Sequence, residues 1–458
     1  MMLGQGVDMK DSELNVLAAD INRDAFPLRA NETTDYDPLL KSIGNARFVL
    51  IGEASHGTHE FYRERAEISK RLISEYGFSA VAVEADFPDA YRINSYVRAA
   101  GNDSTAIESL AGFKRFPTWM WRNADVLDFV GWLRAYNDDL SDKNQKAGFY
   151  GLDLYSLHTS IDVVLSYLQK IDPDGAVRAR ERYSCFEHFG EDTQTYGYAT
   201  AFGIAESCED EVVGQLTEFN RRATELANRD GRVAADEFFM AEQNARLVKN
   251  AEQYYRTMYR SDVSSWNLRD KHMVETLVSL EKHIGSIGGK PPKIVVWEHN
   301  SHLGDARATE MSRRGELNVG QLVREKYGAE AFLIGFTTYN GTVTAATNWG
   351  DMPERKRVRS GLDGSVESLF HRANNDRFFI PFREDKNLGL KLKTPMLERA
   401  IGVIYRPETE RQSHYFQTRL SDQFDAVIHI DETRAVEPLE RTAEWERGEP
   451  AETFPFGV

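Results

Sequence analysis

Short apolar runs that end on carboxylate or imidazole side chains recur along this chain. The first run, at about 47–52, is followed at once by Glu53 and His56. Three more runs end in the same way: 80–83 before Glu84, 149–152 before Asp153, and 294–297 before His299 and His302. Apolar runs of this length are typical of buried strands, and open α/β sheets gather polar side chains at the carboxyl ends of their strands. The pattern therefore predicts one sheet edge that holds one active site.

The segments between these runs predict helices, so that strands and helices alternate. Phe61, Ile68 and Leu72 recur at helical spacing, which indicates a helix over about 58–76. A strand–helix–strand unit implies parallel strands. Further strands are predicted at about 79–84, 147–152, 331–336, 342–346, 378–381, 401–405 and 426–430, with helices at 88–98 and 122–140. The expected fold class is α/β, with a central, mainly parallel sheet flanked by helices.

The alternation stops in the middle of the chain. Residues 176–283 contain long helical windows and no proline, which favours a helical insertion at about 173–285. We expect this insertion to belong to a catalytic domain of residues 36–458, preceded by a tail and a short helix in residues 1–35. Asn340-Gly341 lies between two strand-like runs and predicts a hairpin.

Charge and composition exclude several classes of partner. With a formal net charge of −16, the chain predicts no basic surface for nucleic acid or an anionic membrane, and we interpret the basic cluster at 354–359 as a solvated loop. No apolar stretch approaches the ~20 residues that span a bilayer, and the first residues do not resemble a signal peptide. A cytoplasmic location is therefore expected. Cys185 and Cys208 are interpreted as buried or idle thiols.

Glu53 and His56 are the leading candidates for chemistry. Histidine titrates near neutral pH and can remove a proton from water, while a carboxylate can orient the ring. Either Glu53 or Glu84 could supply that carboxylate. Because Asp153 and His299 end other strands, the cluster favours catalysis over simple capping of a loop.

Two other chemistries use residues of the same cluster. A serine nucleophile is disfavoured, because the G-x-S-x-G elbow is absent around Ser55 and its hydroxyl would struggle to reach the adjacent His56. His56 and His59 form an HxxH pair, as do His299 and His302, which leaves open a divalent metal such as zinc. Neither pair matches the HExxH motif.

Several residues outside the strand ends could also face a pocket. Arg65, two turns into the first helix, could bind an oxyanion or a carboxylate, with a surface ion pair as the alternative. Trp121 and Arg122 belong to an aromatic and polar cluster. Arg269 and Asp270 suggest a structural ion pair.

The combined motifs resemble those of the erythromycin esterase family. They are Ile51-Gly52-Glu53-Ala54-Ser55-His56-Gly57, Arg65, Val83-Glu84 and Trp297-Glu298-His299-Asn300-Ser301-His302, and their order agrees over roughly residues 40–430. The resemblance implies a hydrolase that opens an ester or lactone without a covalent enzyme intermediate and without a required metal. His56 then matches the family's general base, Glu53 and Glu84 its acidic partners, Arg65 its arginine, and His299 and His302 its later histidines.

We therefore predict a carboxylic ester or lactone hydrolase, with a macrolide lactone as one candidate substrate. The predicted catalytic residues are His56, Glu53, Glu84, Arg65 and His299, and the predicted substrate-binding residues are His302, Asp153, His59, Trp121 and Arg122. We expect a small-molecule substrate and no cofactor, with a divalent metal left open. More distant similarity to the haem-binding ChaN lipoproteins and the Tiki-type metalloproteases gives two alternatives, a metal-dependent hydrolase and a haem or small-molecule binding protein.

Overall fold

The central element of the protein is an eight-stranded sheet. The computed structural model describes residues 10–30, 32–190, 192–227, 232–383 and 386–448. In sheet order the strands are β1 (Phe26–Pro27), β9 (Arg377–Pro381), β12 (Ala426–Ile430), β6 (Ala331–Thr337), β2 (Phe48–Ile51), β5 (Ile294–Trp297), β3 (Ala80–Asp86) and β4 (Gly148–Asp153). The strands from β12 to β4 are parallel, whereas β9 and β1 are each antiparallel to their neighbours. The predicted α/β class with a mainly parallel sheet is confirmed.

Both faces of this sheet are buried, which explains why its strands are continuous apolar runs. Val49 and Ile51 of β2 point into one core, while Phe48 and Leu50 belong to the core on the opposite face. The first core is covered by α2 (Asp37–Ile43), α3 (His59–Tyr76) and α6 (Ala124–Asp138). The second is covered by α1 (Asp11–Asp24), α12 (Asp262–Gly288) and α14 (Val319–Tyr327).

The first strand–helix–strand unit skips one position in the sheet. The strands β2 and β3 that flank α3 are parallel, but β5 lies between them. A strand from much later in the chain thus separates the two early strands. As a result, the residues that follow β5 lie between the residues that follow β2 and those that end β3.

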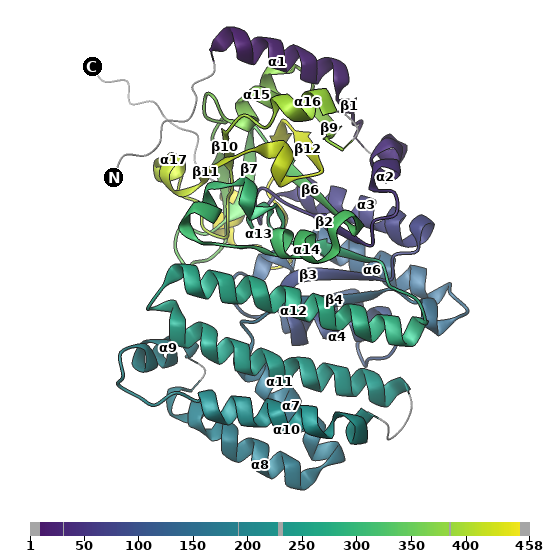
Figure 1. Cartoon of the computed structure of the whole chain (residues 1–458), viewed down its shortest axis with the longest axis vertical. Helices are drawn as coiled ribbons and strands as arrows, with labels where there is room; N and C mark the ends of the chain where they lie inside the picture. The colour runs from purple at the N-terminus through teal and green to yellow at the C-terminus, as the bar shows by residue number, and fades with distance from the viewer. Residues whose placement is uncertain (1–9, 31, 191, 228–231, 384–385, 449–458) are drawn as a thin grey trace.

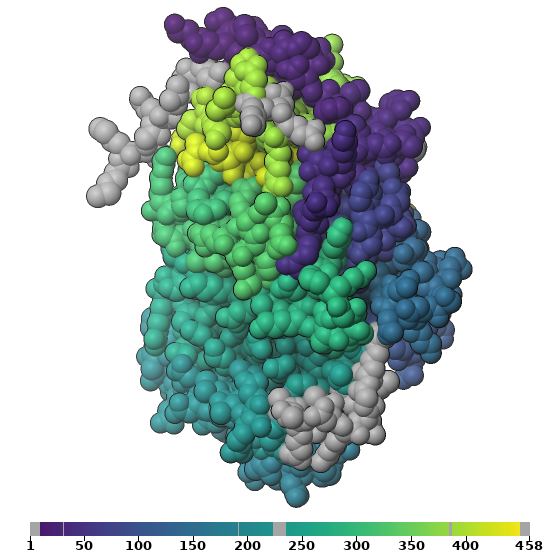
Figure 2. Space-filling model, turned by 45° about the vertical axis from the view of Figure 1, so that its right-hand side comes forward, coloured from purple at the N-terminus to yellow at the C-terminus, as the bar shows by residue number. Residues whose placement is uncertain are grey.

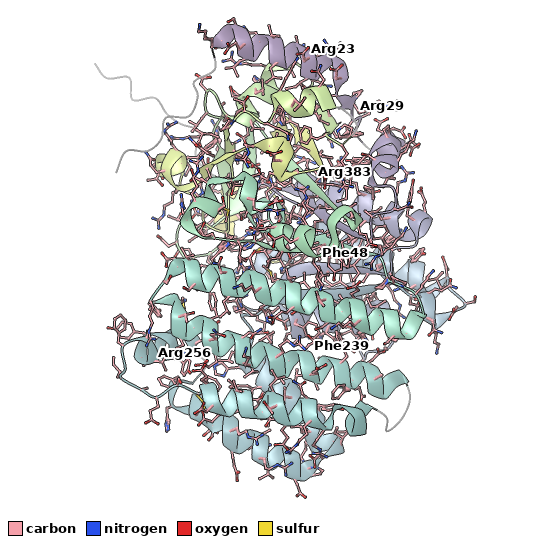
Figure 3. The ribbon with its side chains drawn as sticks, viewed as in Figure 1. Arg23, Arg29, Phe48, Phe239, Arg256 and Arg383 are labelled. Carbon is pink, nitrogen blue, oxygen red and sulfur yellow. A yellow bond between two sulfur atoms is a disulfide. The ribbon has the colours of Figure 1, made fainter. Side chains whose placement is uncertain are left out.

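A stack of helices extends the fold on the α12 side. In chain order its helices are α7 (Leu157–Ile171), α8 (Pro173–Tyr183), α9 (Thr193–Ala201), α10 (Glu209–Ala227), α11 (Arg232–Met258) and α12. Figure 1 shows α12 across β3 and β4, with α11, then α7 and α10, and finally α8 farther from the sheet. Phe48 of β2 and Phe239 of α11 belong to one continuous core, although they lie in different layers (Figure 3). The helices expected over 176–283 are present, and α7 joins the same stack.

The remaining helices are short and connect the strands or cover the sheet edges. They are α4 (Phe87–Val97), α5 (Ala106–Ser109), α13 (Asn300–Leu303), α15 (Val366–Arg372), α16 (Lys386–Lys391), α17 (Glu410–Ser413), α18 (Leu420–Gln423) and α19 (Ala443–Arg447). The described part of the N-terminal segment packs against the rest of the fold, unlike a detached tail. Figure 2 shows the purple N-terminal segments directly against light-green segments from the C-terminal part, α1 packs on α15, and β1 extends the sheet.

Three local predictions were wrong. Asn340-Gly341 makes no hairpin between β6 and β7 (Asn340–Ala345), because β7 leaves the main sheet to pair with β8 (Glu354–Val358) and β13 (Glu432–Thr433). The basic cluster interpreted as a loop is β8, in which Lys356 is buried. The strand expected at 401–405 is only two isolated bridges, and the strand pair lies instead at β10 (Met396–Arg399) and β11 (Tyr415–Thr418).

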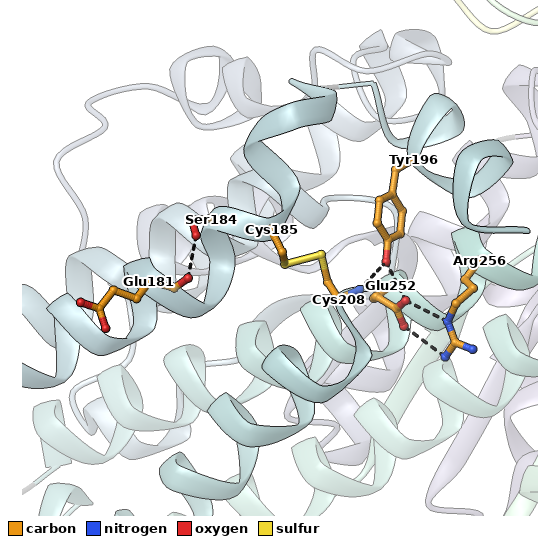
Figure 4. The surroundings of a disulfide bond; sticks show 7 residues. All are labelled: Glu181, Ser184, Cys185, Tyr196, Cys208, Glu252 and Arg256. Atoms are coloured by element: carbon orange, nitrogen blue, oxygen red, sulfur yellow. Dashed lines mark hydrogen bonds and ion pairs between the residues drawn. A yellow bond between two sulfur atoms is a disulfide. The ribbon is translucent and has the colours of Figure 1, made fainter. Parts of the chain in front are cut away.

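The two cysteines form a disulfide bond, contrary to the expectation of idle thiols. Cys185 and Cys208 are separated by 23 residues, but the fold of α9 brings their Cα atoms to 5.9 Å. Beside the bond, the Tyr196 hydroxyl donates to Glu252, which also pairs with Arg256 (Figure 4). Sequence spacing could not reveal this pairing because it depends on how the helices pack. Disulfides are rare in cytosolic proteins, so the bond gives no support to the predicted cytoplasmic location.

Glycines near the strand ends are required by close backbone approach. A Cβ atom at Gly57 would lie 1.8 Å from the carbonyl oxygen of Thr344, and one at Gly52 would lie 2.1 Å from Asn300 Oδ1. Neither residue has a positive φ, so space alone imposes glycine at these two positions.

No helix among the described residues is long and apolar enough to cross a lipid bilayer.

Replacing Gly57 with alanine should destabilise the fold. Because the neighbouring atom belongs to backbone, the clash cannot be relieved by a side-chain rotation, and we expect a loss of about 1–3 kcal/mol of unfolding free energy. Gly131→Ala is the matched control, since that glycine lies in α6 with open space around it. Denaturant unfolding should show a lower midpoint for Gly57→Ala and an unchanged or higher midpoint for Gly131→Ala. Equal stability of Gly57→Ala and the native chain would contradict this packing.

Candidate active site

Four adjacent strands deliver the polar residues to one cavity. They are β2, β5, β3 and β4, which are neighbours in the parallel part of the sheet. The cavity at their carboxyl ends has a volume of about 320 Å³, and its lining includes His56, Glu84, Asp153, His299 and His302. The sequence prediction of a shared edge therefore places these five residues together. A concave site of this size suits a small molecule.

Glu53 holds both His56 and Arg65. One carboxylate oxygen lies 2.9 Å from His56 Nδ1, and the other lies 2.8 Å from Arg65 Nη2. Arg65 is fully buried and packs over the rings of Tyr62 and Trp297. Arg65 therefore binds a carboxylate behind the cavity, and it does not line the space where an oxyanion would form.

His56 is oriented so that one nitrogen faces the cavity. Because Nδ1 is bonded to Glu53, Nε2 is the nitrogen that can meet a molecule in the cavity. The Tyr62 hydroxyl also donates to the backbone carbonyl of His56, which fixes the turn after β2. A neutral imidazole with its proton on Nδ1 presents a lone pair at Nε2, as a general base requires.

His299 stands beside His56 with its ring in the neutral form. The two ring centroids are 4.7 Å apart. Burial, together with the neighbouring His56, lowers the pKa of His299 well below its usual value. The backbone N–H of Ser301 donates to Nδ1 at 3.3 Å, so the ring proton belongs on Nε2, next to the Ala54 carbonyl and without a hydrogen bond of good geometry. His299 can therefore donate a hydrogen bond but is not positively charged.

Glu84 does not orient His56, contrary to one of the predicted alternatives. β3 has a register irregularity between Val83 and Asp86, and Glu84 lies in it. Bulges redirect side chains beside functional sites. The Glu84 carboxylate binds Arg269 Nη2 at 2.7 Å and accepts the backbone N–H of His299 at 2.9 Å. Burial alone would raise its pKa, but His302 and Arg269 lower it, so Glu84 is ionised.

Arg269 lies on α12 and binds residues at three of the four strand ends. Its guanidinium donates to Asp153 at 3.0 and 2.7 Å, to Glu84, and to His302 Nε2 at 2.9 Å. Asp270 instead accepts a hydrogen bond from His302 Nδ1 at 3.0 Å. The prediction of an ion pair between Arg269 and Asp270 was therefore wrong. Successive helical residues point in different directions, which lets Arg269 face the cavity while Asp270 binds the far side of the imidazole.

His302 is a part of this network and not a free imidazole. Trp266 stacks on its ring with centroids 4.3 Å apart. Burial lowers the pKa of His302, but Asp270 and Glu84 outweigh that effect and raise it. Both ring nitrogens are occupied by Asp270 and Arg269, so the residue lines the cavity but is held in place.

Two of the five predicted substrate-binding residues lie outside the cavity, and the other three line it. His59 begins α3 and bonds to Asp125 of α6 at 2.9 Å. Arg122 pairs with Glu440 and donates to the Leu110 carbonyl. Neither contributes to the lining, so these two predictions are corrected: each faces away from the strand ends and is already paired. Trp121 does line the cavity, as predicted.

One residue of each rival chemistry lies outside the cavity. The Ser55 hydroxyl contacts Thr58 and does not line the cavity. Because His59 turns to Asp125, the first HxxH pair is divided between two places. Within the described ranges, no group of three or more His, Cys, Asp or Glu side chains has the geometry of a metal site.

Several cavity residues escaped the sequence prediction. Arg269 was noticed but given a different partner, and Asp86, Asp89, Arg115 and Tyr155 were not singled out as site residues. Asp86 and Asp89 follow directly after Glu84 in the same strand-end segment, so the strand-end pattern contained a signal for them. Nothing in the sequence pattern placed Arg115 or Tyr155 beside them.

Comparison with known proteins relates most of the chain to one protein family. The family described as erythromycin esterase matches residues 73–433. YbfO of Bacillus subtilis is 23% identical over 430 residues, covering 90% of each chain. The erythromycin esterase type II of Escherichia coli is 21% identical over 423 residues, covering 88% of this chain and 93% of that protein.

Solved structures show the same fold. A Bacillus cereus protein superposes with a TM-score of 0.77 at 22% identity, covering 93% of this chain and 99% of the other. A variant of the erythromycin esterase EreC in its open conformation gives a TM-score of 0.62 at 18% identity, covering 90% of this chain and 96% of that one. At these identities the structural likeness establishes the fold alone.

Glu298 is a buried acid beneath the site. It is fully buried, and neither of its oxygens has a hydrogen-bond partner among the described residues. Burial, with Glu84 and Asp270 nearby, raises its pKa well above the usual value. Glu298 is therefore a neutral carboxylic acid in the folded protein at neutral pH but ionises when the chain unfolds.

Replacing Glu298 with glutamine should stabilise the protein in a pH-dependent way. The unfolded chain loses a proton above a pKa of about 4.3 while the folded chain keeps it, which costs stability as the pH rises above that value. We expect the gain of Glu298→Gln to grow by up to about 1.4 kcal/mol per pH unit between pH 5 and 7.5. Denaturant unfolding of both proteins across this range measures it. Parallel pH profiles for the two proteins would show that Glu298 is ionised in the folded state.

Proposed function

This chain belongs to the erythromycin esterase family, and we propose that it hydrolyses a carboxylic ester or lactone with His56 as the general base for water. The observation that carries the proposal is the pair of Glu53 and His56, whose Nδ1 is occupied and whose Nε2 faces the cavity. The names of the relatives in Escherichia coli support the class of reaction.

The proposed reaction adds water to the carbonyl carbon. As the water oxygen attacks, its proton moves to His56 Nε2, and Glu53 stabilises the imidazolium that forms. The bond between the carbonyl carbon and the ester oxygen then breaks. The imidazolium returns the proton to the leaving alcohol oxygen, so that a carboxylic acid and an alcohol are released and His56 is neutral again.

The supporting residues have separate tasks in this proposal. Arg65 pairs with the Glu53 carboxylate and holds it in place without touching the substrate. His299, neutral and next to His56, lines the cavity beside the general base. Glu84 and Arg269 keep His299 and His302 in position.

Substitution of His56 should remove most of the activity while the fold is retained. General acid–base catalysis contributes about 10²–10⁴-fold, so His56→Ala should lose that much kcat. Ser55→Ala is the matched control, because Ser55 adjoins His56 in sequence but contacts Thr58 outside the cavity. Turnover measured with each purified, folded variant should fall only for His56→Ala. Loss of turnover in Ser55→Ala but not in His56→Ala would point to a serine nucleophile instead.

Chelator treatment should leave turnover unchanged. The proposed mechanism moves protons between water, His56 and the leaving group and uses side chains for each step. We expect the same kcat before and after dialysis against EDTA, with metal content measured on both samples. Activity that disappears with the chelator and returns with a divalent metal would favour the metal-dependent alternative.

The substrate is best sought among esters and lactones of different size. A macrolide lactone is one candidate, because relatives of this chain are named for erythromycin. A hydrolysis screen of macrolides, simple lactones and acyl esters, with His56→Ala beside the native protein, identifies the class. Hydrolysis that does not depend on His56 would count against the proposal for that compound.

A further inference from the structure

One wall of the cavity is acidic and aromatic. We call it the outer wall, and it consists of Asp86, Asp89, Phe113, Trp121, Tyr155 and Trp349. Asp86 ends β3 and Asp89 lies in the first turn of α4. Trp349 is 54% exposed, whereas His56 is 7% exposed, so Trp349 is the member of the outer wall that meets incoming molecules first.

The charged side chains of the cavity leave one carboxylate unpaired. Four carboxylates line the cavity (Glu84, Asp86, Asp89 and Asp153) against two guanidiniums (Arg115 and Arg269). Arg269 is shared by Asp153 and Glu84, and Arg115 Nε lies 3.0 Å from Asp86. Within the part of the chain that the structure describes, Asp89 makes no ion pair. Asp89 is therefore the lining carboxylate that is left to meet a ligand.

The surroundings of Asp89 are those of a carboxylate that lacks a cation. Burial and the adjacent Asp86 raise its pKa to about 6, while the more distant Arg115, Arg92 and Lys114 lower it. Asp86 itself is 5% exposed, and its Oδ1 has no hydrogen bond of good geometry. A positive charge at the outer wall would stabilise both carboxylates.

The aromatic members of the outer wall suit a cation as well. The ring of Tyr155 already contacts two guanidiniums, those of Arg115 and Arg269, at 4.6 and 5.0 Å, so the rings of the other three aromatic members are those left for a ligand. The Trp121 ring lies 6.3 Å from that of Phe113. Aromatic faces together with a carboxylate are the usual means of binding an alkylammonium group.

We propose that the outer wall binds a protonated amine, and hence that the preferred substrates are esters or lactones that carry an alkylammonium group. This inference rests on the proposed hydrolase function for its consequence but not for the binding itself. Asp89 supplies the negative charge, Asp86 adds to the local potential, and the aromatic rings cover the alkyl groups of the amine. The ester group then extends inward to His56 and His299.

A matched pair of esters tests the inference. 2-(Dimethylamino)ethyl phenylacetate carries an ammonium group, and 3-methylbutyl phenylacetate has the same shape without the charge. We expect kcat/KM for the amine ester to exceed that for the neutral ester by about tenfold, the size of one charge-assisted hydrogen bond. The preference should decline as the pH falls through about 6, because Asp89 then takes up a proton. The ratio of the two esters cancels any pH effect that both reactions share.

Two variants assign the preference to Asp89. Asp89→Asn should remove the preference, so that the ratio of kcat/KM between the amine ester and the neutral ester falls to about one. Asp125→Asn is the control, because Asp125 binds His59 and does not line the cavity. An equal rate for both esters in the native protein, or a preference that survives Asp89→Asn, overturns the inference.

Binding measured without turnover separates this inference from the hydrolase proposal. Calorimetry with His56→Ala and the amides N-[2-(dimethylamino)ethyl]phenylacetamide and N-(3-methylbutyl)phenylacetamide requires no hydrolysis. Tighter binding of the amine amide, lost in a second protein that also carries Asp89→Asn, supports the outer wall even if neither ester is hydrolysed. Equal binding of the two amides overturns it even if both esters are hydrolysed.

Discussion

Two guanidinium groups, one fully buried and one partly buried, hold the acidic edge of the sheet together. The parallel order of β2, β5, β3 and β4 brings several carboxylates to one place, where they would repel each other in a medium of low dielectric constant. Arg65 from α3 neutralises Glu53, and Arg269 from α12 binds Asp153 and Glu84. The two helices lie on opposite faces of the sheet, so the site depends on both layers. Losing either arginine would leave a buried charge without a partner.

This arrangement separates the tasks of chemically similar groups. Glu53 and Glu84 both end strands of the sheet, yet Glu53 orients His56 while Glu84 holds the backbone of His299 and the side chain of Arg269. His56 has one nitrogen facing the cavity, whereas His302 has both nitrogens bonded. The same types of side chain therefore supply the reacting group in one place and its support in another.

The sequence predicted the fold class and most of the inner site because both depend on local patterns. A buried strand can be recognised from its apolar composition. In a parallel sheet, the residue after the carboxyl end of a strand lies at the same edge of the sheet whatever the position of that strand. The contacts made through α12 could not be predicted, since the partner of Arg269 depends on how that helix crosses the sheet. The disulfide also depends on how helices pack, so it could not be predicted either. For the same reason the sequence wrongly suggested that His59 and Arg122 line the cavity, although both bind residues outside it.

The central claim is that water, activated by His56, attacks the substrate directly. Intact-mass measurement of the enzyme, quenched with acid during a single turnover of an ester that the screen has identified, tests it most directly. The account predicts an unchanged protein mass at every time point, with acid and alcohol released at the same rate. A chain that becomes heavier by the mass of the acyl group, with alcohol released before acid, would contradict it.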